Sequence, residues 1–434
     1  MGQERASTYD VAIVGAGAAG LWAAMAIGRA AAERGRAVPR IALVEKTARS
    51  GTKVLASGGT RCNLTTTLEP DAAARLFGPD AERFLLPALW NLPPSSVRER
   101  FHELGVPTVE APLEKVFPAS DRARDVRDAL ERAAIESNAD FLFDARVTTV
   151  GRTSEGWRLD VEGADALECR RLLLCAGGAS YPGSGTTGDG YAWLESLGLP
   201  LVDPVPSLVP LVSPAEWVHE LAGIAPQDVE ARIQGPSGRT LARRRRPIVF
   251  TQVGISGPGA MDLSEPVARW AAAGGRGEPP TLALDLAPDR SREELREALV
   301  AAAGAKGAPR IGRALALDIP RRLMAAVASS IGLSESDPRA QSLGRGQRHE
   351  WIERIKGLTL PVTDTLGLAK AEVTAGGLAL KVLDPETCAV RGQPGLYVFG
   401  ELLDVQGPIG GLNFQAAWSC AQLAAEDVVR SLDA

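Results

Sequence analysis

Residues near the start of the chain form a glycine pattern that could hold the phosphates of a dinucleotide. The segment Gly15 to Gly20 reads GAGAAG, follows a short apolar run, Tyr9–Val14, and opens an alanine-rich stretch. In this setting Gly15 allows a tight turn, Gly17 lets a pyrophosphate approach the backbone, and Gly20 lets the helix pack close to the strand. The N-terminus of the helix stabilises the anion. The pattern therefore predicts a strand, a phosphate-binding turn and a helix.

Glu45 supplies the second feature of such a site. It ends the next apolar run, RIALVE at residues 40–45, about 25 residues after the last glycine, which is close to the spacing of a dinucleotide-binding βαβ unit. A carboxylate at this place can accept hydrogen bonds from the hydroxyls of an adenosine ribose. An ordinary glycine-rich turn would explain the glycines but not the strand, the helix and the acid together. We therefore interpret these segments as a dinucleotide-binding unit.

A second stretch of glycines, from Gly183 to Gly188, has the same spacing and reads GSGTTG. Here Tyr181 and Pro182 separate the glycines from the apolar run at residues 171–175, and the residue before a proline avoids the helical region. No acid follows at the end of a strand at the right distance. An NAD(P) site is one interpretation of this stretch. We favour the other, a glycine-rich loop beside a cofactor held elsewhere.

The loop Ser57–Thr65, SGGTRCNLT, combines glycines, hydroxyls, an arginine and an asparagine. The backbone N–H groups of such a loop can wrap a phosphate or a flavin ring. Cys62, within this loop, is either a redox thiol or nucleophile, or a residue that packs or contacts a flavin. It has no Cys or His neighbour in the sequence, which favours the second interpretation.

The segment 400–413 contains a second helix start that suits an anion. Gly400 and Glu401 end an apolar run, and a double glycine followed by Leu412 and Asn413 opens the last predicted helix. In a flavoprotein this place suits the C2 carbonyl and N1 of the flavin, where negative charge grows on reduction. An ordinary capped helix is the alternative, but the doubled glycine favours the flavin.

Composition and charge argue against several function classes. The chain has 434 residues, of which 45% are hydrophobic and 23% charged, so we expect a globular protein of two or three domains. The formal net charge of -5 argues mildly against nucleic-acid binding. The run Arg243–Arg246 is more typical of a solvated loop than of an anion site. The three histidines are scattered, and we expect no metal.

The cysteines and the N-terminal segment predict a cytoplasmic protein. Five cysteines with irregular spacing and no CxxC motif indicate a reducing compartment without a disulfide framework. The first ten residues lack the apolar core of a signal peptide. No apolar run is long enough to span a bilayer.

The order of the predicted elements indicates an α/β fold with a discontinuous first domain. Residues 1–203 and 358–434 would form this domain, and residues 204–357 would form an insert. Within the insert, residues 204–285 are expected to be mostly β and residues 286–357 mostly helical.

The motifs together resemble the BaiN/YhiN-like family of bacterial flavoproteins, also called aminoacetone oxidase-like FAD-binding enzymes. The resemblance spans nearly the whole chain and rests on VGAGAAGL at 14–21, SGGTRCNLT at 57–65, CAGGASYPGSGTTGDGYAW at 175–193, PSLVPL at 206–211, FTQVGISGPGAMDLS at 250–264, EVTAGGL at 372–378 and GELLDVQGPIGGLNFQAAWS at 400–419. Two positions depart from the family. Thr60 stands where a glycine is common, and Gln252 stands where a histidine is common. If residue 252 contacts the substrate, the chemistry of the family need not transfer.

The resemblance implies FAD bound noncovalently in a Rossmann-like fold of the two-dinucleotide-binding-domain type, with an inserted β-barrel-like and helical domain. Glu45 would hold the ribose, Val147 would lie near the adenine, and residues 63–65 would lie near the flavin. NAD(P)H is a candidate transient electron donor. The residues expected to bind the cofactor are Gly15, Gly17, Ala18, Ala19, Gly20, Glu45, Lys46, Lys53, Arg61, Asn63, Leu64, Thr65, Val147, Ala176, Gly177, Gly400, Glu401, Gly411, Leu412 and Asn413.

Three hypotheses for the function stay open at this point. The first is an FAD-dependent reductase that saturates a C=C bond conjugated to a carbonyl, with hydride leaving flavin N5. The second is an FAD-dependent oxidase, for example of amines, that produces hydrogen peroxide. The third is a flavin-bearing binding or sensor protein without turnover. No decisive acid or base is visible, and the candidate substrate-side residues are Cys62, Tyr181, Ser256 and Asp404. We expect a small organic substrate and no nucleic-acid or membrane partner.

Overall fold

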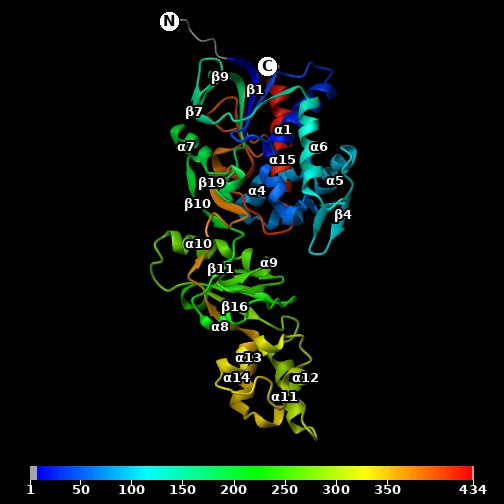
Figure 1. Ribbon diagram of the computed structural model, residues 1–434, viewed down its shortest axis with the longest axis vertical. Helices are drawn as coiled ribbons and strands as arrows, with labels where there is room; N and C mark the ends of the chain where they lie inside the picture. Colours follow the sequence, from blue (N-terminus) through cyan, green and yellow to red (C-terminus); the bar gives the residue numbers. More distant parts are fainter. Residues whose placement is uncertain (1–6, 433–434) are drawn as a thin grey trace. The chain divides into compact units, whose positions relative to one another are not determined.

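The computed structural model describes residues 7–432, and the chain divides into two compact units (Figure 1). The first unit extends to Pro204 and resumes at Glu372, and the second comprises Val205–Ala371. Residues 358–371 therefore belong to the second unit, whereas the sequence placed them in the first. The reason is that β17 (Leu358–Pro361) pairs with β16 (Thr281–Asp285) and completes a sheet of the second unit.

The main sheet of the first unit has a Rossmann-type parallel core. Five strands run parallel in the order β6-β2-β1-β9-β20, and the antiparallel hairpin β7-β8 also joins β9. The strands are β1 Ser7–Val14, β2 Ile41–Val44, β6 Ala139–Leu142, β7 Val147–Arg152, β8 Trp157–Val161, β9 Leu167–Leu174 and β20 Leu396–Val398. The apolar runs at β1 and β2 are buried, as expected for parallel strands with both faces covered. The predicted α/β Rossmann-like fold is confirmed.

Helix α1 (Ala18–Glu33) packs against α15 (Leu412–Ser431) and α6 (Ala123–Glu136), and these three helices lie side by side in Figure 1. Most of α1 is buried. Its alanines and glycines follow from this, because small side chains let neighbouring helices and strands approach closely. The packing holds the N-termini of α1 and α15 in fixed places, and both N-termini carry predicted site residues.

Shorter elements complete the first unit. Its other helices are α2 Thr52–Ala56, α3 Pro70–Arg75, α4 Pro79–Asn91, α5 Pro94–Glu103 and α7 Asp189–Ser196. A small antiparallel sheet is formed by β3 Thr65–Thr66, β5 Lys115–Pro118 and β4 Thr108–Ala111, and β10 Leu201–Ser207 pairs with β19 Val373–Leu378. Within residues 7–432, every helix is too short or too polar to cross a membrane.

The second unit is mostly β in its first part and mostly helical in its second, but the expected β-barrel is not confirmed. Its strands form two separate four-stranded antiparallel sheets, β14-β15-β11-β18 and β13-β12-β16-β17. The remaining strands are β11 Leu211–Val212, β12 Glu230–Gln234, β13 Thr240–Arg245, β14 Val249–Thr251, β15 Gly254–Ser256 and β18 Asp364–Thr365. The helices are α8 Glu216–His219, α9 Pro258–Met261, α10 Ser264–Ala272, α11 Arg292–Gly304, α12 Ile311–Leu315, α13 Arg321–Ser330 and α14 Arg345–Lys356.

Candidate cofactor site

The carboxyl edge of the parallel sheet gathers segments that lie far apart in the sequence. Gly15 comes directly after β1, and Glu45 comes directly after β2. Ala176 lies two residues after the end of β9, and Gly400 lies two residues after the end of β20. Parallel strands end at the same edge, and ligands of open α/β sheets bind outside that edge. The fold thus brings four of the predicted cofactor segments to one place.

The glycines of the first motif have three different environments. A Cβ added to Gly15 would lie 2.6 Å from the carbonyl oxygen of Cys175, and one added to Gly20 would lie 1.9 Å from the carbonyl oxygen of Gly15. These two positions exclude a side chain because backbone fills the space. A Cβ on Gly17, by contrast, would meet nothing within 4 Å, and Gly17 caps α1 without a side-chain hydrogen bond. The open space faces the start of a helix, as a bound pyrophosphate requires.

Glu45 is half-buried beside this turn. One carboxylate oxygen accepts a hydrogen bond from the Ala16 N–H at 2.9 Å, and the other accepts from the N–H and the hydroxyl of Thr47, each at 2.9 Å. A carboxylate oxygen has two acceptor sites, so Oε2, which accepts only from Ala16, keeps one for a ribose hydroxyl. The open space at Gly17 and the carboxylate at Glu45 together fit the ADP half of FAD.

The loop after α2 has an unusual left-handed backbone. Gly58, Gly59, Thr60 and Cys62 have φ angles of 56°, 67°, 71° and 62°. Thr60 and Cys62 carry side chains at angles that favour glycine, and such strain persists where the surrounding structure holds it and often marks a functional loop. The common family glycine at position 60 has a physical reason, because a glycine adopts this angle without cost.

The side chains of this loop fasten it to its neighbours. Arg61 lies over the ring of Phe117, with its Cζ 4.2 Å from the centroid, and makes an ion pair with Asp121 at 3.6 Å. Asn63 Oδ1 accepts a hydrogen bond from the Val116 N–H at 3.1 Å. These contacts fix the position of both side chains, and the Asn63 amide NH₂ keeps its donors for a ligand.

The surroundings of Cys62 disfavour a role as nucleophile. Its side chain is fully buried, and burial raises the pKa of its thiol to about 12. The thiolate is the reactive form of cysteine, and it is scarce at neutral pH for such a group. The burial and the raised pKa favour the interpretation of Cys62 as a packing residue over the catalytic one.

The start of α15 meets the end of the same loop. A Cβ on Gly411 would lie 2.0 Å from the carbonyl oxygen of Thr65, so only glycine allows this approach. The Thr65 hydroxyl bonds Gln415, and the indole N–H of Trp418 donates to the Leu64 carbonyl at 2.9 Å. The structure thus joins the two segments that the sequence assigned to the flavin.

Asn413 and Leu412 contribute to this helix start in a different way from that expected. The Asn413 amide accepts from the Gly407 N–H and donates to the Gly407 carbonyl, both at 2.8 Å. Leu412 is 2% exposed. Their side chains shape the 407–411 turn, and backbone N–H groups remain for a ligand.

Lys53 and Glu401, predicted separately, form an ion pair of 2.6 Å between Nζ and Oε2. Lys46 pairs instead with Asp189 at 2.6 Å.

Val147 is buried at the first position of β7. Gly177 has a φ of 76°, and a Cβ there would lie 2.4 Å from Thr186 Cγ2.

The other catalytic candidates have different surroundings. Tyr181 is 46% exposed and has a φ of 54°. Asp404 Oδ1 accepts from the Gly376 N–H at 3.1 Å. Ser256 belongs to the second unit, where its hydroxyl contacts Met261 Sδ at 3.4 Å.

Two site residues escaped the sequence reasoning, Ser180 and Thr374. Both hydrogen-bond Glu401, as described below. Each lies inside a motif that carries the family resemblance, CAGGAS for Ser180 and EVTAGG for Thr374. Their place in these motifs is the signal that could have identified them.

Two arginines of the run Arg243–Arg246 in the second unit form ion pairs. Arg244 pairs with Asp262 at 2.7 Å, and Arg245 bonds both Asp228 and Asp289. No cluster of three or more potential metal ligands occurs in the described part of the chain. The run was expected in a solvated loop, but Arg243, Arg244 and Arg245 lie on β13, and the Arg244 side chain is only 17% exposed.

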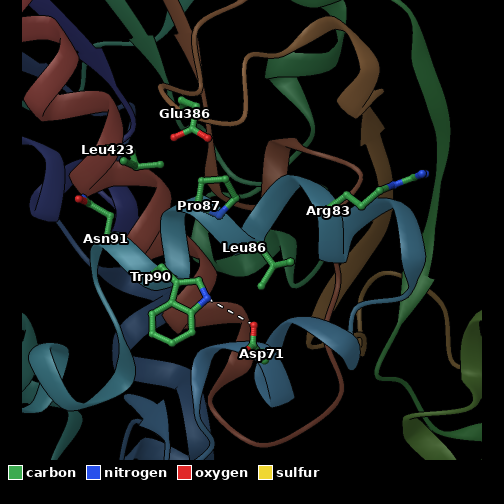
Figure 2. Close-up of a pocket in the computed structure, with 8 residues that line it drawn as sticks. All are labelled: Asp71, Arg83, Leu86, Pro87, Trp90, Asn91, Glu386 and Leu423. Atoms are coloured by element: carbon green, nitrogen blue, oxygen red, sulfur yellow. Dashed lines mark hydrogen bonds between the residues drawn. The ribbon is translucent and has the colours of Figure 1, made fainter.

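A hollow of about 560 Å³ lies along α4, away from the predicted residues (Figure 2). Its lining combines Trp90, whose indole N–H donates to Asp71 at 3.4 Å, with Arg83, Glu386 and apolar side chains. None of the predicted cofactor residues lines it.

Comparisons with known proteins match the chain from end to end. The family model described as HI0933-like protein Rossmann domain matches residues 9–427. The chain is 30% identical over 427 residues to the ribosomal RNA dihydrouridine synthase of Escherichia coli (strain K12), covering 97% of this chain and 98% of that protein. It is 29% identical over 415 residues to the 3-dehydro-bile acid delta(4,6)-reductase of Clostridium scindens, covering 95% and 97%.

A solved structure with a similar fold is the 3-ketosteroid delta1-dehydrogenase from Sterolibacterium denitrificans. Its TM-score is 0.53 at 14% identity, with 98% of this chain and 100% of that chain covered. At this identity the likeness shows the fold alone. The family match over nearly the whole chain shows more: the protein belongs to the HI0933-like Rossmann-domain family and is an FAD-dependent oxidoreductase.

Proposed function

We propose that this flavoprotein reduces a carbon–carbon double bond conjugated to a carbonyl group. The supporting observation is the chemistry that two relatives share by name. A dihydrouridine synthase saturates a ring C=C of uracil beside a carbonyl, and a delta(4,6)-reductase of a 3-dehydro-bile acid removes C=C bonds in conjugation with the 3-oxo group. The two substrates differ in size and charge, but the reacting atoms are alike. We therefore propose for this protein the step that the two relatives share, the reduction of a conjugated C=C bond.

The residues that would hold FAD follow from the site. The start of α1 and the open space at Gly17 would take the pyrophosphate, and Glu45 would take the adenosine ribose. The loop at residues 57–65 and the start of α15 would take the flavin end. When bound and reduced, FAD supplies a hydride from N5, and the protein supplies orientation and electrostatics.

The chain's own groups would favour the reduced cofactor. The N-terminus of α15 carries the positive end of a 20-residue helix, and it would stabilise negative charge at the flavin N1 and C2 carbonyl. Noncovalent binding is part of the proposal. Its support is that the thiol in this region, Cys62, is buried and protonated.

A small organic substrate remains our first proposal, with NAD(P)H as transient donor and the cytoplasm as location. The ion pairs of Arg244 and Arg245 support it, since these two arginines of the run already have carboxylate partners. The five described cysteines are free and buried, which supports a reducing compartment. A uracil ring within RNA is the second candidate, favoured by the identity to the dihydrouridine synthase.

Flavin absorbance tests the proposal. The purified holoprotein is reduced anaerobically and mixed with a 4-en-3-one or 4,6-dien-3-one steroid, or with unmodified ribosomal RNA. Oxidation of the flavin with formation of the saturated product supports the reductase and identifies the substrate class. Fast reoxidation by oxygen alone, with hydrogen peroxide formed, supports the oxidase instead. Mass spectrometry of the chromophore released on denaturation must give FAD, and FMN alone, or a chromophore that stays on the polypeptide, would contradict the proposed binding.

A further inference from the structure

Four polar side chains from four separate segments meet beside the dinucleotide turn. They are Lys53 on α2, Ser180 after β9, Thr374 on β19 and Glu401 after β20, and we call them the Thr374 network. All four belong to the first unit. Ser180 and Thr374 are fully buried.

The Thr374 hydroxyl is the centre of this network. It accepts hydrogen bonds from the N–H groups of Ala179 and Ser180, at 2.9 and 3.0 Å, and donates to Glu401 Oε1 at 3.0 Å. The Thr374 N–H donates to the same oxygen at 3.0 Å. One residue thus holds both the loop after β9 and the carboxylate after β20. Its donor and both acceptor positions are in use.

The Glu401 carboxylate connects Thr374 to Lys53. Oε1 also accepts from the Ser180 hydroxyl at 2.8 Å, and Oε2 accepts from Lys53 Nζ at 2.6 Å. Lys53 donates a second hydrogen bond to Ser180 Oγ at 2.7 Å. An ammonium group has three donors, so Lys53 keeps one N–H beyond these two contacts. Its side chain is 27% exposed.

The network is tied to the dinucleotide turn from two sides. The Gly51 N–H, next to α2, donates to the Ala16 carbonyl at 2.8 Å. A Cβ on Gly400, next to Glu401, would lie 3.3 Å from the Cβ of Ala19 in the first turn of α1. A displacement of Lys53 or Glu401 would therefore also shift the turn where the pyrophosphate would bind.

We propose that Thr374 is a positioning residue of the cofactor site. Through one hydroxyl it fixes the loop at residues 176–180 and Glu401, and through Glu401 it fixes the Lys53 ammonium beside the dinucleotide turn. The remaining N–H of Lys53 suits an anionic ligand, and the phosphates of the cofactor are anionic. Preorganisation of this kind raises affinity because the bound geometry is already formed.

The test is the FAD dissociation constant of the full-length holoprotein, measured by the flavin fluorescence that appears on dilution. Thr374→Val keeps the shape of the side chain and removes its hydroxyl, and we expect FAD binding at least ten-fold weaker. Thr374→Ser restores the hydroxyl and should bind within three-fold of the unchanged protein. Thr365→Val is the matched control, because Thr365 is a buried threonine of the second unit that accepts only a long hydrogen bond, 3.3 Å from the Gly367 N–H.

A double-mutant cycle separates positioning from general stability. Lys53→Met should weaken FAD binding in the unchanged protein and do so several-fold less in the Thr374→Val background, because Lys53 has then already lost its fixed place. Independent effects of the two changes would overturn the proposal, as would equal losses in Thr374→Val and Thr374→Ser, or binding within three-fold in Thr374→Val. If Thr374→Val is insoluble, Ser180→Ala decides: a loss of at least three-fold supports the network, and no loss overturns it. No substrate is used, so the outcome is independent of the proposed reaction.

Discussion

The Glu45 carboxylate accepts a hydrogen bond from the Ala16 N–H at 2.9 Å. This contact joins the end of the second strand to the turn that follows the first strand. The acid and the glycine motif, whose residues Glu45 and Ala16 lie 29 positions apart in the chain, therefore form one structure. The carboxylate holds the turn, and we propose that its remaining acceptor site takes a hydroxyl of the adenosine ribose.

Glu45→Gln should weaken FAD binding by about ten- to hundred-fold. A hydrogen bond to a charged group contributes about 1.5–3 kcal/mol, and the amide NH₂ would face the N–H groups of Ala16 or Thr47. The FAD dissociation constant measures the loss. Glu155→Gln, in the exposed turn between β7 and β8, is the control and should have no effect. Unchanged FAD affinity in Glu45→Gln would contradict the assignment of this acid to the ribose.

Gly17→Val should abolish FAD binding while the protein still folds. Gly17 has an extended backbone, with φ −79° and ψ −164°, and a Cβ there meets no protein atom within 4 Å. The space that the new side chain takes is the space that a pyrophosphate needs. Gly20→Val is the contrasting variant, because its Cβ would lie 1.9 Å from the Gly15 carbonyl and should disrupt the packing of α1 itself.

Circular dichroism and released flavin distinguish these two glycines. Gly17→Val should be soluble and folded but colourless, and Gly20→Val should lose thermal stability even without FAD. A yellow Gly17→Val protein with normal FAD content would show that this turn is not the phosphate site.

Thr60→Gly should raise the free energy of unfolding by about 1 kcal/mol, because the left-handed region costs a side chain about 1–2 kcal/mol and costs glycine little. The φ of Thr60 is 71°. Thr60→Ala keeps the strain and should gain nothing. Thermal unfolding of the deflavinated protein compares the three. A loss of stability in Thr60→Gly would mean that contacts of the threonine outweigh its backbone strain.

The buried thiols predict a loss of stability above pH 9. Burial raises the pKa of both Cys62 and Cys169 from 9.0 to about 12. Between these values the unfolded chain releases protons that the folded chain retains, so ionisation favours unfolding. Each such thiol lowers the free energy of unfolding by about 1.4 kcal/mol per pH unit in this window.

Urea unfolding at pH 8, 9, 9.5 and 10 tests this prediction. Stability should be level to pH 9 and then fall, and Cys62→Ala should reduce the slope. The thiols dominate below pH 10, since Tyr397 and Tyr191, whose pKa values burial also raises from 10.0, contribute mainly above it. A stability that rises between pH 9 and 10 would contradict the burial of these groups.

Local patterns predicted the parts of the site that depend on neighbouring residues. The GAGAAG turn and Glu45 could be recognised because a strand, a turn and a helix have fixed spacings along the chain. Lys53 and Glu401 were both singled out, but their ion pair was not, because 348 residues separate them and only the fold brings them together. Thr374 was missed for the same reason, since a buried threonine has no pattern of its own.

The domain boundary and Cys62 show two other limits of the sequence. The return to the first unit was placed near Leu358, where apolar runs resume, but β17 begins there and pairs in the second unit. An apolar strand does not reveal its partner. Cys62 lies in a polar, glycine-rich loop, yet its side chain is fully buried, and the sequence of a loop does not show which of its side chains is buried.

NAD(P)H should have no stable site of its own at Gly183–Gly188. A phosphate-binding turn must lie between a strand and a helix whose N-terminus faces the anion. Here Pro182–Ser184 form a short turn of 3-10 helix, and the first residue of α7 is Asp189, whose carboxylate already pairs with Lys46 at 2.6 Å. An incoming phosphate would meet that negative charge. Titration of the oxidised holoprotein with a nonreducible NAD(P)H analogue should therefore show only weak binding, unchanged in Gly185→Val. Tight binding that Gly185→Val removes would overturn this prediction and would place a dedicated donor site in the loop.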